Sequence, residues 1–242
     1  GQELPPILLL HGFDSSAMEF RRLFPHLAKQ AQTWAVDLLG FGFTERPDGL
    51  EISTGAIQQH LYAFWKMAIQ RPVVLVGASM GGAAAIDLAL AFPEAVEKLV
   101  LLDSAGYSSG PAVGPLLIPP LGYLVTEKFL RTPKVRQQIS EKAYHDSRFA
   151  SLDAQRCAAL HLDCPNWSKA LISFTRSGGY RSFKDKLAQL QCPTLIVWGE
   201  SDQILGTKDA RRLQSAIPGS QLLWVAECGH VPHLEKPEFT AE

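Results

Sequence analysis

A chain of 242 residues, 46% hydrophobic and 19% charged, is long enough for one large α/β domain, and this composition argues against disorder. The formal net charge of −1, from 23 Lys and Arg against 24 Asp and Glu, gives no reason to expect a nucleic acid as partner. No apolar run approaches the roughly 20 residues that span a bilayer, so integral membrane association is not expected.

The four cysteines have neither the spacing of zinc ligands nor that of a redox pair; they are Cys157, Cys164, Cys192 and Cys228. We therefore expect reduced thiols in a cytoplasmic protein. The chain begins with Gly1 rather than Met, which leaves the location open to a removed targeting segment. The sequence gives no indication of the oligomeric state.

The first predicted strand is Ile7 to Leu10, a short apolar run followed at once by His11-Gly12-Phe13-Asp14. A buried strand that ends in His-Gly is a suitable place for a loop whose backbone N–H groups bind an oxyanion. Taken alone, an ordinary β-to-α turn explains this segment equally well. Trp34 to Val36 is the next strand, and we expect Asp37 and Arg46 to hold the Gly-rich turn after it by hydrogen bonds.

The segment from Val73 to Pro93 is the most informative part of the chain. Val73 to Val76 is β-branched and apolar, which is typical of a buried parallel strand, and Ala83 to Leu90 favours a helix. Between them lies Gly77-Ala78-Ser79-Met80-Gly81. A strand that turns sharply into a helix forces the central residue outward, so Ser79 is predicted to be strained and exposed at the helix N-terminus. A helix N-cap is the plainer interpretation of this serine.

Strand-like runs are absent from Gly106 to about Asp185, where helical segments follow a Pro- and Gly-rich apolar stretch. We therefore predict a helical insertion at 106–185 within a core domain made of 1–105 and 186–242. Leu117, Tyr123 and Trp167 are candidates for roofing a substrate pocket, although most apolar residues here would form the insertion's own core. His145 and His161 are interpreted as polar surface histidines.

Two further strands end in polar residues. Thr194 to Trp198 is followed by Gly199-Glu200-Ser201-Asp202, and Gln221 to Val225 leads into Gly229-His230. The carboxyl ends of parallel strands open onto one edge of a sheet, so Ser79, Asp202 and His230 are predicted to meet there.

These motifs resemble the α/β-hydrolase fold superfamily, in particular its cap-bearing serine hydrolases. The matching segments are His11-Gly12-Phe13, the turn from Asp37 to Pro47, Gly77 to Gly82, Gly199 to Asp202 and Gly229 to Pro237. The chain order serine, acid, histidine is that of the family. The resemblance implies an α/β fold, with a mostly parallel central sheet flanked by helices and a helical cap insertion.

The residue types define a chemistry. A serine hydroxyl needs a base, so His230 would accept the proton of Ser79 while Asp202 orients the imidazole. The backbone N–H groups of Phe13 and Met80 are the candidates for the oxyanion hole. Asp103 also ends a strand and is the alternative acid, whereas the resemblance makes His233 a supporting residue. Neither a metal nor an organic cofactor is expected.

The leading hypothesis is a serine hydrolase that cleaves a small, largely apolar carboxylic ester or related acyl compound. One alternative is a C–C bond hydrolase of the meta-cleavage-product type, which usually has a glycine-rich oxyanion loop that this chain lacks at Phe13-Asp14. Another is a receptor or scaffold of the same fold that binds a ligand without turning it over.

Overall fold

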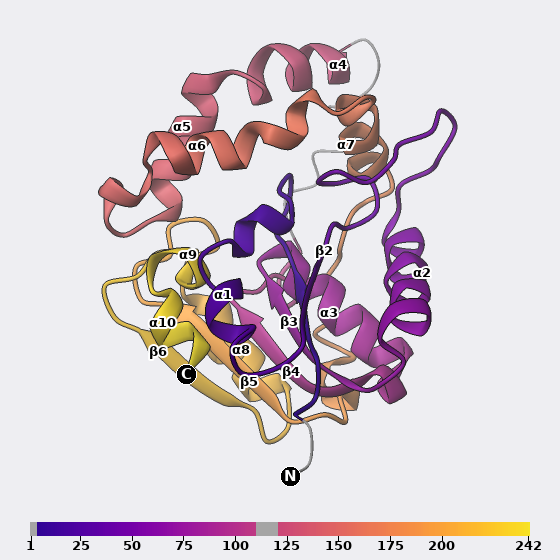
Figure 1. Cartoon of the computed structure of the whole chain (residues 1–242), viewed down its shortest axis with the longest axis vertical. Coiled ribbons are helices and arrows are strands. Elements are labelled where there is room, and N and C mark those ends of the chain that lie inside the picture. Colours follow the sequence, from indigo (N-terminus) through magenta and orange to yellow (C-terminus); the bar gives the residue numbers. More distant parts are fainter. Residues whose placement is uncertain (1–3, 110–120) are drawn as a thin grey trace.

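A six-stranded parallel sheet forms the centre of the molecule (Figure 1). The computed structural model describes residues 4–109 and 121–242. The strand order is β2-β1-β3-β4-β5-β6. The strands are β1 Ile7–Leu10, β2 Thr33–Val36, β3 Val73–Ala78, β4 Val96–Leu102, β5 Thr194–Gly199 and β6 Gln221–Val225. The parallel α/β architecture predicted from the sequence is confirmed.

The strand order places the first strand inside the sheet, where β1 pairs with both β2 and β3. The chain therefore moves outward to β2 and then crosses back to β3, so the winding reverses between β1 and β3. Ligands of open α/β sheets bind at such a reversal, outside the carboxyl ends of the strands. Gly12-Phe13 follows β1 and Ser79 follows β3, so both predicted elements lie at this point.

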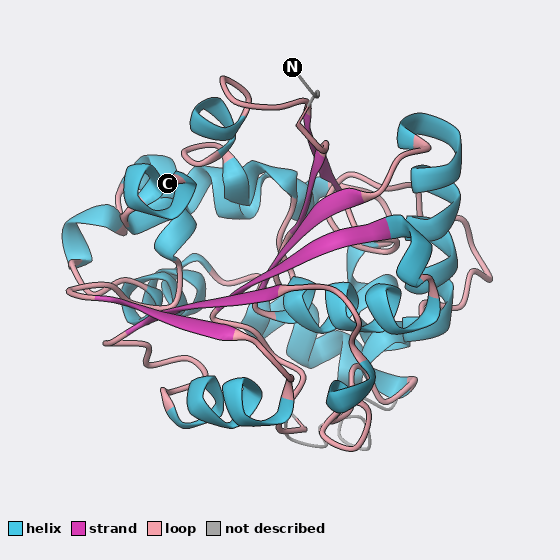
Figure 2. Cartoon of the chain, turned by 90° about the horizontal axis from the view of Figure 1, so that it is seen from below, coloured by secondary structure: helices cyan, strands magenta, loops and turns pink. Residues whose placement is uncertain are grey.

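Alternate side chains of each strand point to opposite faces of the sheet, and each face is covered by helices (Figure 2). Leu8 and Leu10 of β1 belong to one buried cluster, and Leu9 belongs to the other. The first cluster includes residues of α2, Thr54–Phe64, of α3, Met80–Ala91, and of α8, Lys208–Ala216. The second includes Leu27 of α1, Phe24–Leu27, and Ala241 of α10, Pro237–Ala241, packs against it. A single π-helical turn, Trp65–Ile69, extends α2.

The turn after β2 is held by its own polar side chains, as the sequence predicts. Asp37 accepts hydrogen bonds from the backbone N–H groups of Ala17 and Phe43, at 2.7 and 3.0 Å. The Arg46 guanidinium donates to the carbonyl groups of Gly40, Thr44 and Gly42. Both charged groups are thereby used within the core domain.

A layer of helices between β4 and β5 lies above the carboxyl edge of the sheet in Figure 1. It comprises α4 Leu121–Val125, a π-helical turn Thr126–Leu130, α5 Pro133–Ala143, α6 Leu152–Ala159 and α7 Trp167–Arg176, with short turns at Ser147–Phe149 and Leu160–Asp163. We call the described residues 121–176 the cap. Its treatment as a separate domain with limits at 106 and 185 stays a prediction.

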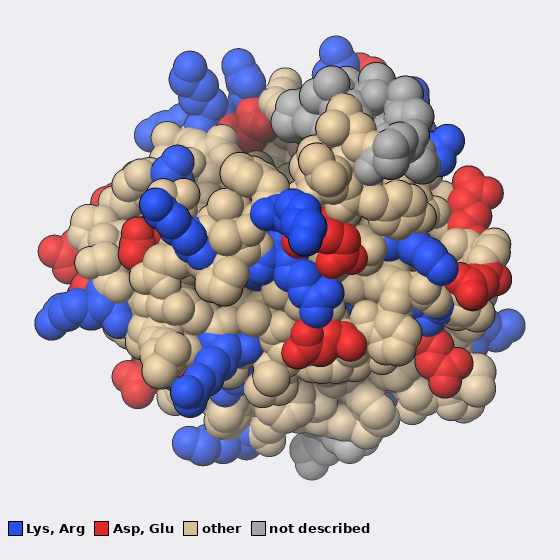
Figure 3. All heavy atoms as spheres, turned by 90° about the horizontal axis from the view of Figure 1, so that it is seen from above, with Lys and Arg blue, Asp and Glu red and all other residues tan. Residues whose placement is uncertain are grey.

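The surface over the cap carries charges of both signs. In Figure 3, Lys and Arg side chains are interspersed with Asp and Glu and with broad uncharged areas. In the part of the chain that the structure describes, every helix is too short or too polar to cross a bilayer.

Candidate active site

Ser79 stands on a strained turn between β3 and α3. Its φ of 52° and ψ of −118° lie in a region that residues other than glycine rarely adopt. The Ser79 N–H donates to Leu102 O at 2.9 Å, and Ser79 O accepts from Ala105 N at 3.0 Å, so neighbouring β4 holds the turn. A Cβ on Gly81 would lie 2.1 Å from Leu10 O, so only glycine lets α3 start this close to β1.

His230 and Asp202 come from the ends of β6 and β5 and are joined directly. His230 Nδ1 lies 3.0 Å from Asp202 Oδ2, and both side chains are buried. Asp202 Oδ1 accepts the backbone N–H groups of Ile204 and Leu205 at 2.7 and 3.1 Å. Burial opposes ionisation of Asp202, but the bond and charge of His230 and the two backbone N–H groups together outweigh it, and the pKa of the carboxyl is lowered. The carboxylate is therefore suited to orient the imidazole.

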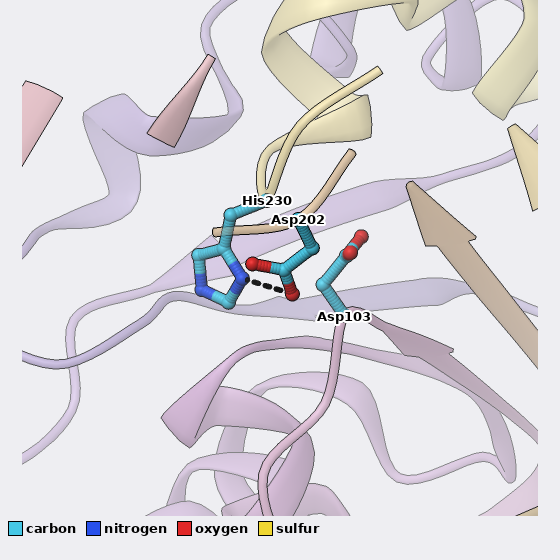
Figure 4. A group of neighbouring side chains, drawn as sticks. All are labelled: Asp103, Asp202 and His230. Atoms are coloured by element: carbon cyan, nitrogen blue, oxygen red, sulfur yellow. Dashed lines mark hydrogen bonds and ion pairs between the residues drawn. The ribbon is translucent and has the colours of Figure 1, made fainter. Parts of the chain in front are cut away.

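Asp103 lies beside this pair without bonding to His230, as Figure 4 shows. Its Oδ1 accepts the Gly199 N–H at 3.0 Å, whereas its Oδ2 has no partner among the described residues. Burial, and then the nearby Asp202 charge, raise the pKa of Asp103 well above its ordinary value. A neutral Asp103 next to an ionised Asp202 is the expected arrangement, because two adjacent carboxylates cannot both ionise cheaply.

Asp103, Asp202 and His230 are also the only described residues whose ligand atoms gather closely enough to suit a metal ion, within 4.8 Å of one another. In this cluster His230 Nδ1 is already bonded to Asp202. A metal at this position would have to break that bond, so the donor set fits a proton-sharing cluster better than a metal centre.

The two backbone N–H groups predicted to bind an oxyanion are free in the described structure. The Met80 N–H is the first of α3 and has no partner within the helix, and the Phe13 N–H donates to no described residue. The neighbouring Gly12 N–H is engaged by Glu19 Oε2 at 3.0 Å. This leaves Phe13 rather than Gly12 as the available donor of its loop.

Glu19 forms a polar support behind this loop. Its Oε1 lies 3.0 Å from His233 Nε2, and its side chain is 11% exposed. Burial opposes ionisation, but the hydrogen bond with His233 and the nearby His11 lower the pKa of Glu19 to about 2. His233 therefore contacts the carboxylate that holds Gly12, which agrees with its predicted supporting position.

A cavity of about 320 Å³ opens between the cap and the sheet edge. Ser79, His230, Phe13 and Glu19 line it from the core. The cap supplies mostly apolar or small side chains, among them Leu130, Ile139, Ala143, Tyr144, Ala154 and Ala158. Its size and apolar character are those of a small-molecule pocket. Ser79 Oγ has no hydrogen bond in the described part of the chain, which leaves its hydroxyl free in this cavity.

Of the three cap residues proposed from the sequence, the two that the structure describes do not line this cavity. Leu117 lies outside the described residues. Tyr123 is 37% exposed, and Trp167 is buried in the main hydrophobic cluster. The Trp167 indole N–H donates to Asp14 Oδ1 at 2.8 Å. Asp14 lines the cavity, so Trp167 binds a cavity-lining carboxylate without lining the cavity itself.

Sequence reasoning missed the polar contacts of Asp14 and misplaced His161. His161 is 1% exposed, not a surface histidine as predicted, because its Nε2 lies 3.1 Å from Asp14 Oδ1 in the joint between cap and core. His145 is exposed as predicted, although its Nδ1 lies 2.9 Å from Ser201 Oγ. Asp14 also has a φ of 49°. Its place directly after His-Gly-Phe was the one available signal, since no spacing in the sequence links it to its distant partners.

Comparison with known proteins assigns the family. The pattern of the α/β hydrolase fold family matches residues 5–237. A relative, the alpha/beta hydrolase domain-containing protein VTE7 of Arabidopsis thaliana, is 34% identical over 235 residues, which cover 96% of this chain and 71% of that protein. The chain belongs to the α/β-hydrolase fold family.

Two further similarities agree with that assignment. The human monoacylglycerol lipase ABHD6 is 27% identical over 98% of this chain and 73% of its own length. The solved structure of the meta-cleavage product hydrolase CumD of Pseudomonas fluorescens IP01 has a TM-score of 0.84 at 24% identity, covering 99% of this chain and 88% of that one. At that identity the likeness concerns the fold. The family and its named relatives make the chain a hydrolase.

Proposed function

We propose that this hydrolase cleaves a small, largely apolar carboxylic ester, or a related acyl compound, through an acyl-enzyme on Ser79. One observation carries the proposal. The strained, unpaired Ser79 and His230 line the same cavity, and His230 Nδ1 is bonded to Asp202 at 3.0 Å. A serine, an imidazole and an orienting carboxylate in this chain order supply nucleophile, base and support.

The proposed reaction has two halves. Ser79 Oγ attacks the ester carbonyl carbon while His230 Nε2 accepts its proton, and the resulting imidazolium returns that proton to the leaving alcohol. Water then attacks the acyl-enzyme with His230 again as base, which releases the acid and restores the Ser79 hydroxyl. Asp202 keeps Nδ1–H directed inward and stabilises the imidazolium in both halves.

The backbone N–H groups of Phe13 and Met80 would bind the negative oxygen of each tetrahedral intermediate. Both are free, and the Met80 N–H lies at the positive end of α3. Losing one such donor typically costs about 2.7–4 kcal/mol of transition-state stabilisation.

The cap residues that line the cavity would choose the substrate without making or breaking bonds. Every residue proposed for bond making lies outside 106–185, whereas Leu130 and Ile139 line the cavity from that insertion. Their replacement by alanine should change the ranking among esters of different chain length more than the rate on the smallest ester. Uniform losses over the whole series would contradict this division of labour.

Cleavage of a C–C bond in a vinylogous diketone is the second candidate. It is favoured by the Gly77-Ala78-Ser79-Met80-Gly81-Gly82 elbow, which resembles that of C–C bond hydrolases. Phe13-Asp14 stands where such enzymes usually carry further glycines, which weighs against it. A scaffold without activity would have no use for an unpaired serine beside an oriented imidazole.

The decisive experiment uses a fluorophosphonate probe and a panel of p-nitrophenyl esters together with a dienoate diketone. Wild type should be labelled and should hydrolyse short esters, whereas Ser79→Ala should remain folded, unlabelled and inactive. Labelling of Ser79→Ala at the wild-type rate would refute the assignment of the nucleophile. Turnover of the diketone in preference to every ester would favour the second candidate, and an unlabelled wild type would favour a scaffold.

A further inference from the structure

The carboxylate of Asp14 joins the loop after β1 to three separate segments of the cap. Arg136 Nη1 of α5 lies 2.8 Å from Oδ2. His161 Nε2, from the turn after α6, and Trp167 Nε1 of α7 lie 3.1 and 2.8 Å from Oδ1. The Asp14 side chain is 13% exposed and that of His161 is 1% exposed, so these bonds are shielded from water. One core carboxylate thus binds polar side chains from three segments of the cap.

Arg136 extends the connection to the backbone. Its Nη2 donates to Ala158 O at 2.8 Å and also reaches Asp14 O at 3.5 Å. The guanidinium therefore links α5, α6 and the loop after β1. Burial opposes ionisation of Asp14, but His161 and Arg136 outweigh it and lower the pKa of its carboxyl. The group is a charged acceptor, whose hydrogen bonds are the stronger kind.

The backbone at Asp14 is in the left-handed region. Its φ of 49° is uncommon outside glycine, although Asp and Asn adopt it more readily than other residues. Asp14 directly follows Phe13, whose N–H is the free donor of the loop, while Glu19 fixes only the preceding Gly12. The segment that follows the donor is held from the cap at Asp14 and from the core at Ser15, whose carbonyl accepts the Gly42 N–H at 3.0 Å.

We propose that Asp14 is a positioning residue that makes the orientation of the Phe13 N–H depend on the docked cap. With its three partners in place, the loop is fixed and the Phe13 N–H points to the oxyanion position. Without them, rotation at Asp14 is released and the donor loses its fixed direction. The inference rests on the proposed ester hydrolysis at Ser79, and it assigns to the cap a part in rate as well as in substrate choice.

The test compares Asp14→Asn with Asp48→Asn. Asparagine retains one acceptor and tolerates positive φ, but it lacks the charge that Arg136 and His161 require. Asp48 makes another ion pair between core and cap, with Lys169 Nζ at 2.7 Å, yet its side chain is 79% exposed and lies away from the Ser79 cavity. It is the matched control for simple loosening of the cap.

Asp14→Asn should lower kcat on a small ester about 10- to 100-fold with little change in KM, because a misplaced donor acts on the transition state alone. Asp48→Asn should stay within about twofold of wild type. A wild-type kcat in folded Asp14→Asn, or equal losses in both variants, would overturn the proposal. So would a loss confined to KM.

A second pair of variants approaches the same contact from the cap. His161→Gln places an amide N–H near the position of Nε2, whereas His161→Leu removes the donor. His161 does not line the cavity, so neither substitution changes the cavity wall directly. The proposal expects His161→Gln to retain most of kcat and His161→Leu to lose it about as Asp14→Asn does. Equal activities of the two would refute it even if Asp14→Asn failed to fold.

Amide hydrogen exchange separates this proposal from the proposed function. The amides of residues 12–15 should exchange faster in Asp14→Asn than in wild type, whatever reaction the enzyme performs. Unchanged exchange would count against the loop–cap link itself. A wild type that neither hydrolyses esters nor reacts with the phosphonate, together with faster exchange in the variant, would refute the ester reaction alone.

Discussion

The cap is fastened to the two sides of the site by different kinds of contact. On the oxyanion side, three cap side chains converge on the Asp14 carboxylate. On the histidine side the cap offers its backbone: the His230 N–H donates to Ala143 O at 2.7 Å. Glu235 accepts the N–H groups of His145 and Asp146 at 3.1 and 2.7 Å.

On the histidine side, the backbones of the cap and the core also approach each other closely. Glu235 binds the Gly229 N–H at 2.8 Å, and a Cβ on Gly229 would lie 2.3 Å from Ala143 O. Backbone contacts of this kind do not depend on which side chains the cap carries at 143–146. We therefore expect that cap sequences can vary there without moving His230, whereas a substitution of Asp14 should release the proposed oxyanion loop. The proposed base, His230, is thus held by backbone contacts, and the proposed oxyanion loop is held by side-chain contacts.

The largest expected effect lies on the fixed side, at Asp202→Asn. The amide keeps the shape of the carboxylate but favours the wrong imidazole tautomer at His230, and a loss of up to about 10⁴ in kcat is the scale to expect. The kinetics of one p-nitrophenyl ester measure it. Labelling by a phosphonate should slow in parallel, because the same base activates Ser79. A loss under tenfold would remove Asp202 from the role of orienting acid.

Ser79, Asp202 and His230 could be predicted from the sequence because strand patterns and short motifs locate them. The apolar run before Gly77 predicts β3, and two strand ends supply Asp202 and His230. A parallel sheet then brings its carboxyl ends to one edge by topology alone. The bond between His230 and Asp202 follows from that placement with little further information.

The cap was predictable as helical but not in its contacts. Helical spacing identifies which residues share a face, yet it does not say how the layer docks on the sheet. Asp14 and His161 are 147 positions apart, and Trp167 looked like a pocket residue because it is large and aromatic. Its indole N–H needed a buried partner, which only the docked arrangement supplies.

The second effect tests the backbone clamp through Glu235→Gln. The buried carboxylate accepts three N–H groups, and an amide in its place turns an NH₂ group toward one of them. We expect about 2–4 kcal/mol less free energy of unfolding together with reduced kcat. Urea denaturation measures the first, with Glu238→Gln, exposed and in the same segment, as the control.

Set beside Asp14→Asn, this variant sharpens the contrast between the two sides. Glu235→Gln should lose stability and activity together, whereas Asp14→Asn should lose mainly kcat. Equal changes in the free energy of unfolding for both variants would show that the two fastenings are alike.

The third effect concerns Glu19, the support of Gly12. The pKa of about 2 lies below the ordinary 4.5, so the unfolded chain takes up the proton first as pH falls. The stabilisation is complete above about pH 4.5 and is lost as pH falls toward 2, amounting to up to about 3 kcal/mol. Glu19→Gln should flatten the stability curve in that window, and exposed Glu97→Gln should not. Parallel curves for the two variants would contradict the pairing with His233.

The smallest effect is expected for Asp103→Asn. Together with Asp202→Asn, this variant decides which of the two carboxyl groups orients His230. Asp103 does not bond to His230, and burial and the nearby Asp202 charge raise the pKa of its carboxyl. An asparagine resembles a protonated aspartic acid: its carbonyl can still accept the Gly199 N–H, and its NH₂ can face Asp202. The kcat of this variant should remain within about threefold of wild type. A loss larger than that of Asp202→Asn would move the acid to Asp103.

Stability against pH gives the same residue a second, independent readout. Because the pKa of Asp103 is raised on folding, its contribution to stability is complete below the unfolded value near 3.8 and declines as pH rises toward the folded value. The decline amounts to about 1.4 kcal/mol per pH unit, and asparagine has none of it. Asp103→Asn should therefore gain on wild type in free energy of unfolding as pH rises above about 3.8 toward the raised pKa of folded Asp103. A constant difference between the stability curves of wild type and Asp103→Asn would mean that Asp103 is ionised. It would contradict the assignment of Asp103 as a neutral neighbour of Asp202.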